Sequence, residues 1–338
     1  MADAFGPFKS DDLAGLVDVE RLRKWLDRQG LATGEPLAVA RLSGGMSNES
    51  FSVRRGGERW VLRRPAQVAL SGADRGMQRE FRVLSALEGT PVPHPEPLAL
   101  CTDGDVIGCA FYLMQHIDGF TALEPTPERF VGDAALQRQV ALSMLEALGE
   151  LAKVDWRGRG LADFGRPEGF HERQVTRWMR QLESYAAREL PGVREVGRWL
   201  ADHQPEAWTP GIMHGDYHTG NLLVAPDPPG RVTAILDWEN ATIGDPLLDL
   251  AGFLRMWEGS DRAGWASRED MIACWERHSG RAAPPLRYYT ALSAFRLAVL
   301  LEGVYQRSLA DPTRQKNEAM GKMVLAIARD AVRAIESS

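Results

Sequence analysis

The sequence predicts an α+β protein in which short strands come first and long helices follow. Two observations predict this order. Between residues 37 and 116, short runs of strand-forming residues alternate with Gly and Pro. Beyond residue 120, apolar residues recur at the three-four spacing of amphipathic helices. The chain has 338 residues, which is enough for one large or two medium domains with real cores.

Composition narrows the classes of protein. The formal net charge of −6 gives no general affinity for nucleic acid or for an anionic membrane surface. No apolar run is long enough to span a bilayer, and the acidic first residues lack the apolar core of a signal peptide. The three cysteines, Cys101, Cys109 and Cys274, show no C-x-x-C spacing. We therefore expect reduced thiols in a cytoplasmic protein.

The first part of the chain is expected to form one helix and then three strands. Leu22, Trp25 and Leu26 lie at helical spacing in a predicted helix over residues 19–28. Strands are expected at 37–42, 51–53 and 60–63. The segment between the first two, SGGMSNES, contains a Gly pair that lets the backbone approach a ligand and cradle phosphates. This segment supplies four candidate nucleotide-binding residues: Gly44, Gly45, Ser47 and Asn48. An ordinary hairpin remains the alternative.

The third strand ends in a basic pair, and a helix with a suitably placed carboxylate follows it. Arg63 can hold phosphates through its planar fork of donors. The helix predicted over residues 73–87 has one apolar stripe, and Glu80 lies beside that stripe, where it could turn toward the strand. We interpret Arg63 and Glu80 as a pair at a nucleotide site, with a solvated strand-end charge as the alternative for Arg63.

Two further strands and a series of helices are predicted after these elements. Strands are expected at 98–101 and 109–116, around the turn at 102–105. Helices are expected at 130–154, 171–190, 250–257, 268–277, 288–309 and 316–335. The helix at 171–190 is expected to bury Val175, Trp178, Leu182 and Tyr185.

The chemistry is concentrated between residues 212 and 249, which read IMHGDYHTGNLLVAPDPPGRVTAILDWENATIGDPLLDL. Phosphoryl transfer needs a carboxylate to orient the attacking hydroxyl, oxygen ligands for Mg²⁺, and donors around the phosphates. Asp216 is the candidate for the first role, and Asn221 with Asp237 for the second. An Asp and an Asn five residues apart match the spacing of the protein-kinase catalytic loop. Asp249 is expected in the first turn of a helix that begins near Asp245-Pro246.

The run H-G-D-x-x-x-x-N, with D-W-E in place of D-F-G and G-D-P-L-L-D-L-A after it, resembles the aminoglycoside phosphotransferase and choline kinase family. Arg63 stands where kinases carry Lys, and the R-E-F-R-V-L helix follows. In both features the chain is similar to the phosphotransferase domains associated with acyl-CoA dehydrogenases. It departs from the family at Ala152, where a His is common.

The resemblance implies a two-lobed, protein-kinase-like fold. It implies an N-terminal lead over residues 1–19, a nucleotide-binding N-lobe over 20–116 and a helical C-lobe over 117–338. ATP and Mg²⁺ would be the cofactors and a small-molecule hydroxyl the acceptor. Backbone groups around Gln115, His116 and Ile117 would meet the adenine edge, and His214 would order the loop by hydrogen bonding.

The acceptor is left open between an aminoglycoside and a hydroxyacyl compound. A polycationic aminoglycoside requires an acidic groove, and only Glu172, Glu183 and Glu239 are scattered candidates. Two other classes of function also remain open. One is a nucleotide-binding pseudokinase that acts as a regulatory module, and the other is a metal-dependent hydrolase that uses His214, Asp216 and His218.

Overall fold

The structure is a computed structural model that describes residue 13 and residues 15–42, 48–66, 72–121, 126–185, 188–310 and 317–336. It divides into two compact units. Unit 1 comprises Met1–Phe120, Leu223–Pro226 and Val232–Glu239, and unit 2 comprises the remaining segments Thr121–Leu222, Asp227–Arg231 and Asn240–Ser338. The chain thus returns to unit 1 twice after residue 222, and Asp237 lies in the second of these returning segments.

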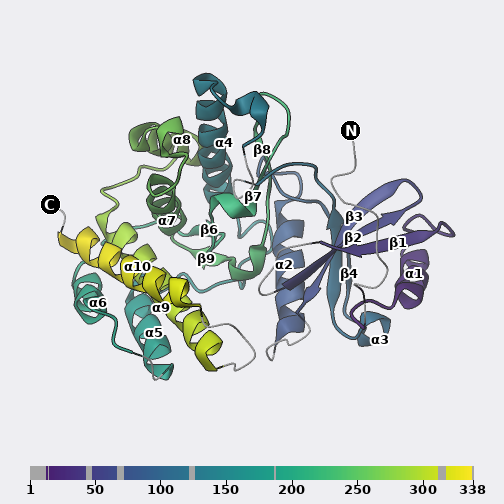
Figure 1. The fold of residues 1–338 in the computed structure, drawn as a ribbon, viewed down its shortest axis with the longest axis horizontal. Helices are drawn as coiled ribbons and strands as arrows, with labels where there is room; N and C mark the ends of the chain where they lie inside the picture. The colour runs from purple at the N-terminus through teal and green to yellow at the C-terminus, as the bar shows by residue number, and fades with distance from the viewer. Residues whose placement is uncertain are drawn as a thin grey trace. The chain divides into compact units, whose positions relative to one another are not determined.

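Unit 1 is built on an antiparallel five-stranded sheet with the order β1-β2-β3-β5-β4 (Figure 1). Gly56 and Gly57 both have positive φ, 56° and 85°, as the tight turn between β2 and β3 requires. The elements are α1 (Val19–Arg28), β1 (Leu37–Arg41), β2 (Asn48–Arg55), β3 (Glu58–Pro65), α2 (Ala73–Leu87), β4 (Pro97–Cys101), α3 (Gly104–Ile107) and β5 (Phe111–Gln115). The short pair β7 (Leu222–Val224) and β8 (Val232–Ile235) follows later in the chain.

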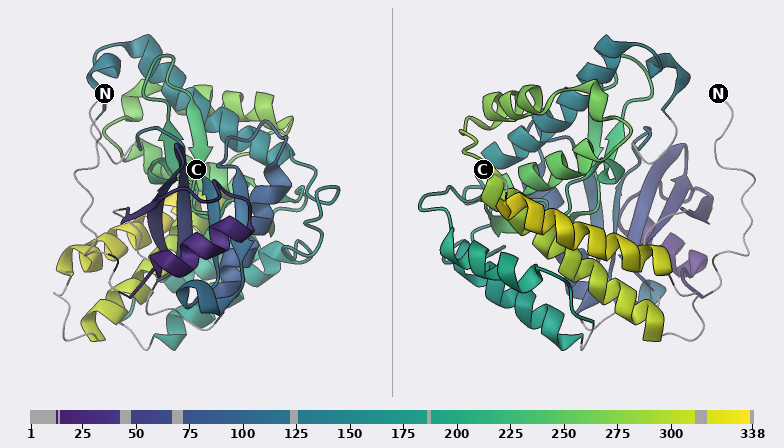
Figure 2. Two further views of the ribbon diagram at one scale, coloured as in Figure 1. Left: turned by 90° about the vertical axis from the view of Figure 1, so that its right-hand side faces the viewer. Right: turned by 60° about the vertical axis from the view of Figure 1, so that its left-hand side comes forward.

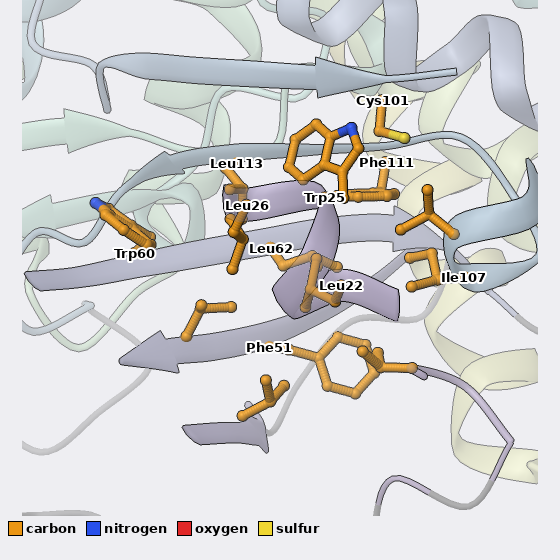
Figure 3. Packing of buried hydrophobic residues seen from close by; sticks show 14 of the residues in the cluster. Leu22, Trp25, Leu26, Phe51, Trp60, Leu62, Cys101, Ile107, Phe111 and Leu113 are labelled. Atoms are coloured by element: carbon orange, nitrogen blue, oxygen red, sulfur yellow. The ribbon is translucent and has the colours of Figure 1, made fainter. Parts of the chain in front are cut away.

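The alternation of side chains along the strands separates a core face from a polar face. Leu62, Phe111 and Leu113 belong to the apolar cluster that Leu22, Trp25 and Leu26 of α1 complete (Figure 3). The rings of Trp25 and Phe111 meet edge to face, with centroids 4.9 Å apart. Neighbouring strand positions point to the opposite face. There Arg63 pairs in register with Tyr112, and α2 packs on that side of the sheet.

Unit 2 is mainly helical. The long helix α4 packs on α8, and α9 lies beside α10 and also contacts α7 (Figure 2). Its helices are α4 (Ala134–Lys153), α5 (Phe170–Ser184), α6 (Val193–Asp202), α7 (Leu247–Glu258), α8 (Arg268–Ser279), α9 (Arg287–Ala310) and α10 (Glu318–Glu336). A two-stranded ribbon of β6 (Gly211–Met213) and β9 (Thr242–Gly244) carries the motif loops, with short 3₁₀ turns at Glu128–Phe130, Thr219–Asn221, Trp238–Asn240 and Ala263–Trp265.

The predicted α+β class and order of elements are confirmed, with three corrections to individual elements. The segment 102–105, predicted as a turn, contains the start of the short helix α3. Helix α5 ends at Ser184 rather than Leu190. Of the four residues predicted to be buried, Trp178 is buried, whereas Val175, Leu182 and Tyr185 are only partly buried, and the helix also buries Phe170, His171 and Gln174. Helix α6 was not predicted, although Val193, Val196 and Leu200 follow Pro191-Gly192 at helical spacing.

Within the described residues, no helix is long and apolar enough to cross a bilayer. The three cysteines are free thiols. Cys101 and Cys274 are buried and Cys109 is partly buried, and burial raises the pKa of all three thiols.

Candidate active site

The H-G-D loop leaves β6 in a conformation that its own residues fix. Gly215 has φ of 82°, and a Cβ at this position would lie 2.4 Å from the carbonyl oxygen of Asn240. No other residue type fits both the dihedral angle and the close approach. The backbone N–H of Asp216 donates to Nδ1 of His214 at 3.3 Å, and His214 is fully buried. His214 therefore orders the loop by hydrogen bonding, as predicted.

Asp249 supports the same loop from the first turn of α7. Its carboxylate accepts the N–H of His214 at 2.6 Å and the N–H of Gly215 at 3.1 Å. The side chain is buried, and burial raises its pKa to about 6 although Arg296 and the two amides oppose the shift. The sequence placed Asp249 in a supporting position but gave no sign that Arg296, on α9, shares its environment.

Asp216 presents an ionised carboxylate. About half of its side chain is exposed. Partial burial raises its pKa, but the neighbouring His218, His214 and Asn221, with the hydrogen bond from His218 foremost, together outweigh that effect, and the pKa lies below its usual value. Nε2 of His218 is 3.5 Å from Oδ2 of Asp216. At neutral pH the group can accept a hydrogen bond from a hydroxyl.

Asn221 is held against Asp216 at the end of the loop. Its Nδ2 donates to the backbone oxygen of Asp216 at 3.0 Å. This bond uses the amide nitrogen and leaves the amide oxygen, the atom that a hard cation prefers, for a ligand.

In unit 1, Arg63 and Glu80 meet as predicted. Nε of Arg63 donates to Oε2 of Glu80 at 2.8 Å, and the other side of the guanidinium bonds Oδ1 of Asp237. Burial lowers the pKa of Arg63, but the acidic groups around it, Glu80 foremost and then Tyr112, Asp237 and Glu239, together more than compensate, so the pKa is raised and the cation is permanent. Burial also raises the pKa of Glu80 to about 7, against the opposing charge of Arg63.

Two more side chains complete this half of the site. Oε2 of Glu80 accepts the hydroxyl of Tyr112 at 2.9 Å, and Oε1 accepts Nδ2 of Asn48 at 3.2 Å. Asn48 also donates to Glu239 at 2.9 Å. Sequence reasoning missed Tyr112 and the role of Glu239. The register of β3 with β5 was the signal for Tyr112, because it puts Tyr112 opposite Arg63.

Asp237 follows β8 in the left-handed backbone region, with φ of 64°. Asp tolerates this region better than most residues, and non-Gly residues in it cluster at functional sites. Arg63 orients the carboxylate, and about a third of the side chain remains exposed. A carboxylate is the kind of oxygen ligand that Mg²⁺ takes.

The remaining predicted residues are placed less completely. Gly44, Gly45 and Ser47 lie outside the described residues. Gln115 ends β5, and its N–H donates to the oxygen of Glu96 at 2.8 Å, so adenine recognition would fall to other backbone groups of 115–117. His116 contacts Arg59, and Ile117 is half-buried.

The geometry does not support the alternative of a metal-dependent hydrolase. Among the residues that the structure describes, no group of three or more His, Cys, Asp or Glu side chains is arranged to hold a metal ion. Nδ1 of both His214 and His218 accepts a backbone N–H.

Comparison with known proteins identifies the family. The profile of the phosphotransferase enzyme family matches residues 38–283, and the chain belongs to this family. It is 33% identical to acyl-CoA dehydrogenase family member 11 of Gallus gallus in an alignment 314 residues long, which covers 86% of this chain and 40% of that protein. The chain thus spans about two fifths of the length of that relative. It is also 26% identical to hygromycin-B 4-O-kinase of Escherichia coli over 81% of this chain and 75% of that enzyme.

Comparison with solved structures identifies proteins of the same fold. A Ralstonia eutropha protein classed as an aminoglycoside phosphotransferase superposes with a TM-score of 0.81 and 29% identity, over 94% of this chain and 98% of that one. The macrolide 2′-phosphotransferase MphH of Brachybacterium faecium shares the fold, with a TM-score of 0.60 and 19% identity over 92% and 97% of the two chains. The protein-kinase-like fold is confirmed.

Proposed function

We propose that the chain transfers the γ-phosphoryl group of ATP, in a Mg²⁺-dependent reaction, to a hydroxyl group of a small molecule. The observation that carries this proposal is the ionised Asp216, held in a loop that Gly215, His214 and Asp249 fix. Catalysis of phosphoryl transfer depends mainly on positioning and electrostatics, and this loop supplies a positioned charge.

Asp216 orients the acceptor. Its carboxylate accepts the hydrogen bond of the attacking hydroxyl and aligns the oxygen with the γ-phosphate. A lowered pKa suits this role, because the transition state is loose and little proton removal is needed before the phosphoryl group moves.

Asn221 and Asp237 would hold Mg²⁺ through oxygen atoms, and the ion would neutralise charge on the phosphates when bound. Arg63 would bind the α- and β-phosphates in place of the usual Lys. Glu80 accepts a hydrogen bond from Arg63 and is itself held by hydrogen bonds from Tyr112 and Asn48. The guanidinium of Arg63 pairs with Glu80 and Asp237, and these two contacts fix the direction of its remaining N–H donors. We retain the 44–48 segment as a phosphate loop and residues 115–117 as the adenine edge.

Two relatives point to different acceptors. One is named as a kinase of hygromycin B, and the other as an acyl-CoA dehydrogenase family member. An aminoglycoside and a hydroxyacyl compound are therefore both candidate acceptors. A reaction that uses ATP and small metabolites would take place in the cytoplasm, where we place the protein.

A thermal-shift titration with ATP and Mg²⁺ tests the nucleotide site. A ligand present at a hundred times its Kd stabilises the folded state by about 2.7 kcal/mol. We expect wild-type protein to be stabilised by ATP with Mg²⁺ and much less by ATP with EDTA. Asp237→Ala should lose the Mg²⁺-dependent part of the shift.

Asp227→Ala is the matched control, because Asp227 is an exposed carboxylate whose ion pair in the described part of the chain is with Arg129. This variant should respond as wild type does. No shift of the wild type at millimolar nucleotide, or an equal shift in Asp237→Ala, would contradict the proposed site.

A further inference from the structure

A basic pocket lies in unit 2 beside the catalytic loop. It is a cavity of about 540 Å³ between α5, the loop before it and β9, a size typical of small-molecule sites. Four arginines line it, namely Arg166, Arg173, Arg177 and Arg180, and Glu172 is the single carboxylate among the lining residues.

The pocket is tied to the catalytic loop through β9. Thr242, which lines the pocket, pairs in register with Met213. Met213 is the residue directly before His214, Gly215 and Asp216. A molecule in this pocket is therefore held against the strand pair from which the catalytic loop departs.

The arginines stand close together on one side of α5. Arg173, Arg177 and Arg180 follow each other at helical spacing, and like charges so placed repel one another. The charge of Arg177 also contributes to lowering the pKa of Arg296, after the larger effect of burial. Positive potential is thus concentrated here at a cost to the folded chain.

Protein carboxylates do not neutralise this charge. Among the described residues, none of the four arginines forms an ion pair, whereas Arg194 on the neighbouring α6 pairs with Glu183. Arg173 donates instead to the backbone oxygens of Glu168 and Arg166, which anchors the loop that carries Arg166. Arg177 and Arg180 are exposed. The guanidinium of Arg177 lies over the ring of Trp178, with Cζ 5.0 Å from the ring centroid; this contact leaves its N–H donors available to a ligand.

We propose that this pocket binds an anionic portion of the phosphoryl acceptor, a phosphate or carboxylate group. That the bound molecule is the phosphoryl acceptor rests on the proposed kinase function. That the pocket binds an anion rests on the arginines that line it. Guanidinium groups bind such oxyanions through paired hydrogen bonds. A polycationic acceptor such as an aminoglycoside is repelled by the same four charges.

Calorimetric titration without nucleotide or metal tests the pocket. Pyrophosphate is the phosphate probe and succinate the carboxylate probe. Binding of either probe to the wild-type protein, weakened about tenfold or more in Arg177→Gln/Arg180→Gln, supports the proposal. The tighter of the two probes identifies which oxyanion the pocket prefers.

Arg194→Gln/Arg198→Gln is the matched control, because it removes two exposed arginines from α6 and none from the pocket. It should bind the probe as wild type does. Three results overturn the proposal: no binding of either probe to the wild type, equal binding in the Arg177/Arg180 variant, or loss of binding in Arg63→Ala alone, which would place the probe in the nucleotide half.

The same variants separate this inference from the proposed function. ATP with Mg²⁺ should stabilise Arg177→Gln/Arg180→Gln as much as wild type. If nucleotide fails to stabilise the wild type while the probes still bind in an Arg177- and Arg180-dependent way, the kinase function is wrong and the anion pocket remains.

Discussion

Gly215 and Asp249 show how single residues fix the catalytic loop. The glycine is required because its φ is positive and because Asn240 leaves no room for a Cβ. Asp249 then accepts the two backbone N–H groups that this turn exposes. Because the Asp249 carboxyl group is buried, its pKa is raised, and it keeps its proton to higher pH than an exposed carboxyl group does.

Asp249 should therefore make stability depend on pH. Its pKa rises from 3.8 to about 6 on folding. Between these values the unfolded chain releases a proton that the folded chain retains. The stability that this group contributes is thus fully present below pH 3.8 and is lost as pH rises toward 6. The loss is about 3 kcal/mol at most.

Asp249→Asn is the test of this dependence. The variant is less stable overall, because it replaces an acceptor of two N–H groups, but its unfolding free energy should fall less between pH 4 and 6 than that of wild type. Urea unfolding at a series of pH values measures both curves. Parallel curves would show that Asp249 does not titrate as described.

At the scale of elements, the alternation of side chains along β3 and β5 places apolar residues on one face of the sheet and polar residues on the other. It turns Leu62, Phe111 and Leu113 toward α1 and turns Arg63 and Tyr112 toward α2. The apolar face holds the sheet in place, and the polar face holds the arginine that we assign to the phosphates. The packing of α1 should therefore govern the stability of unit 1 without touching the site chemistry.

Leu26→Ala tests that separation. Leu26 is fully buried in the cluster of Figure 3, and truncation of a buried leucine costs about 2 to 5 kcal/mol. Arg28→Ala, an exposed position on the same helix, should change stability by less than about 0.5 kcal/mol. Urea unfolding compares the two, and a cost for Leu26→Ala as small as that for Arg28→Ala would contradict the packing described.

The helices show which parts of the fold a sequence reveals. The predicted bounds of α1 and α2 agree with the structure because each carries a continuous apolar stripe. The buried stripe of α5 was predicted only at Trp178, because this helix also buries two polar residues, His171 and Gln174. Nδ1 of His171 meets the hydroxyl of Tyr288 and Nε2 meets Asp245, contacts between segments that are far apart in the chain.

At the scale of the whole molecule, some residues of the candidate site could be predicted from local sequence, and others depend on contacts between distant segments. Asp216, Asn221 and Asp237 were predicted because the motif is nearly continuous in sequence. The partners of Arg63 were partly predicted, since Glu80 lies on the next helix, but Tyr112 required the strand register. The arginine pocket was not predicted. Its arginines lie near one another in the sequence, but the pocket that they line forms only when α5 and β9 are brought together.

The central claim is that Asp216 orients a hydroxyl acceptor for phosphoryl transfer from ATP. The most direct measurement is ATP-dependent turnover on a panel of hydroxy acids, phosphate-bearing alcohols and aminoglycosides, with the phosphate monoester product detected by ³¹P NMR. Asp216→Asn should lower kcat about a thousandfold and leave the Kd for ATP with Mg²⁺ within about twofold. Asp202→Asn, at an exposed carboxylate on α6, should turn over as wild type does. Equal kcat in Asp216→Asn and wild type would contradict the account.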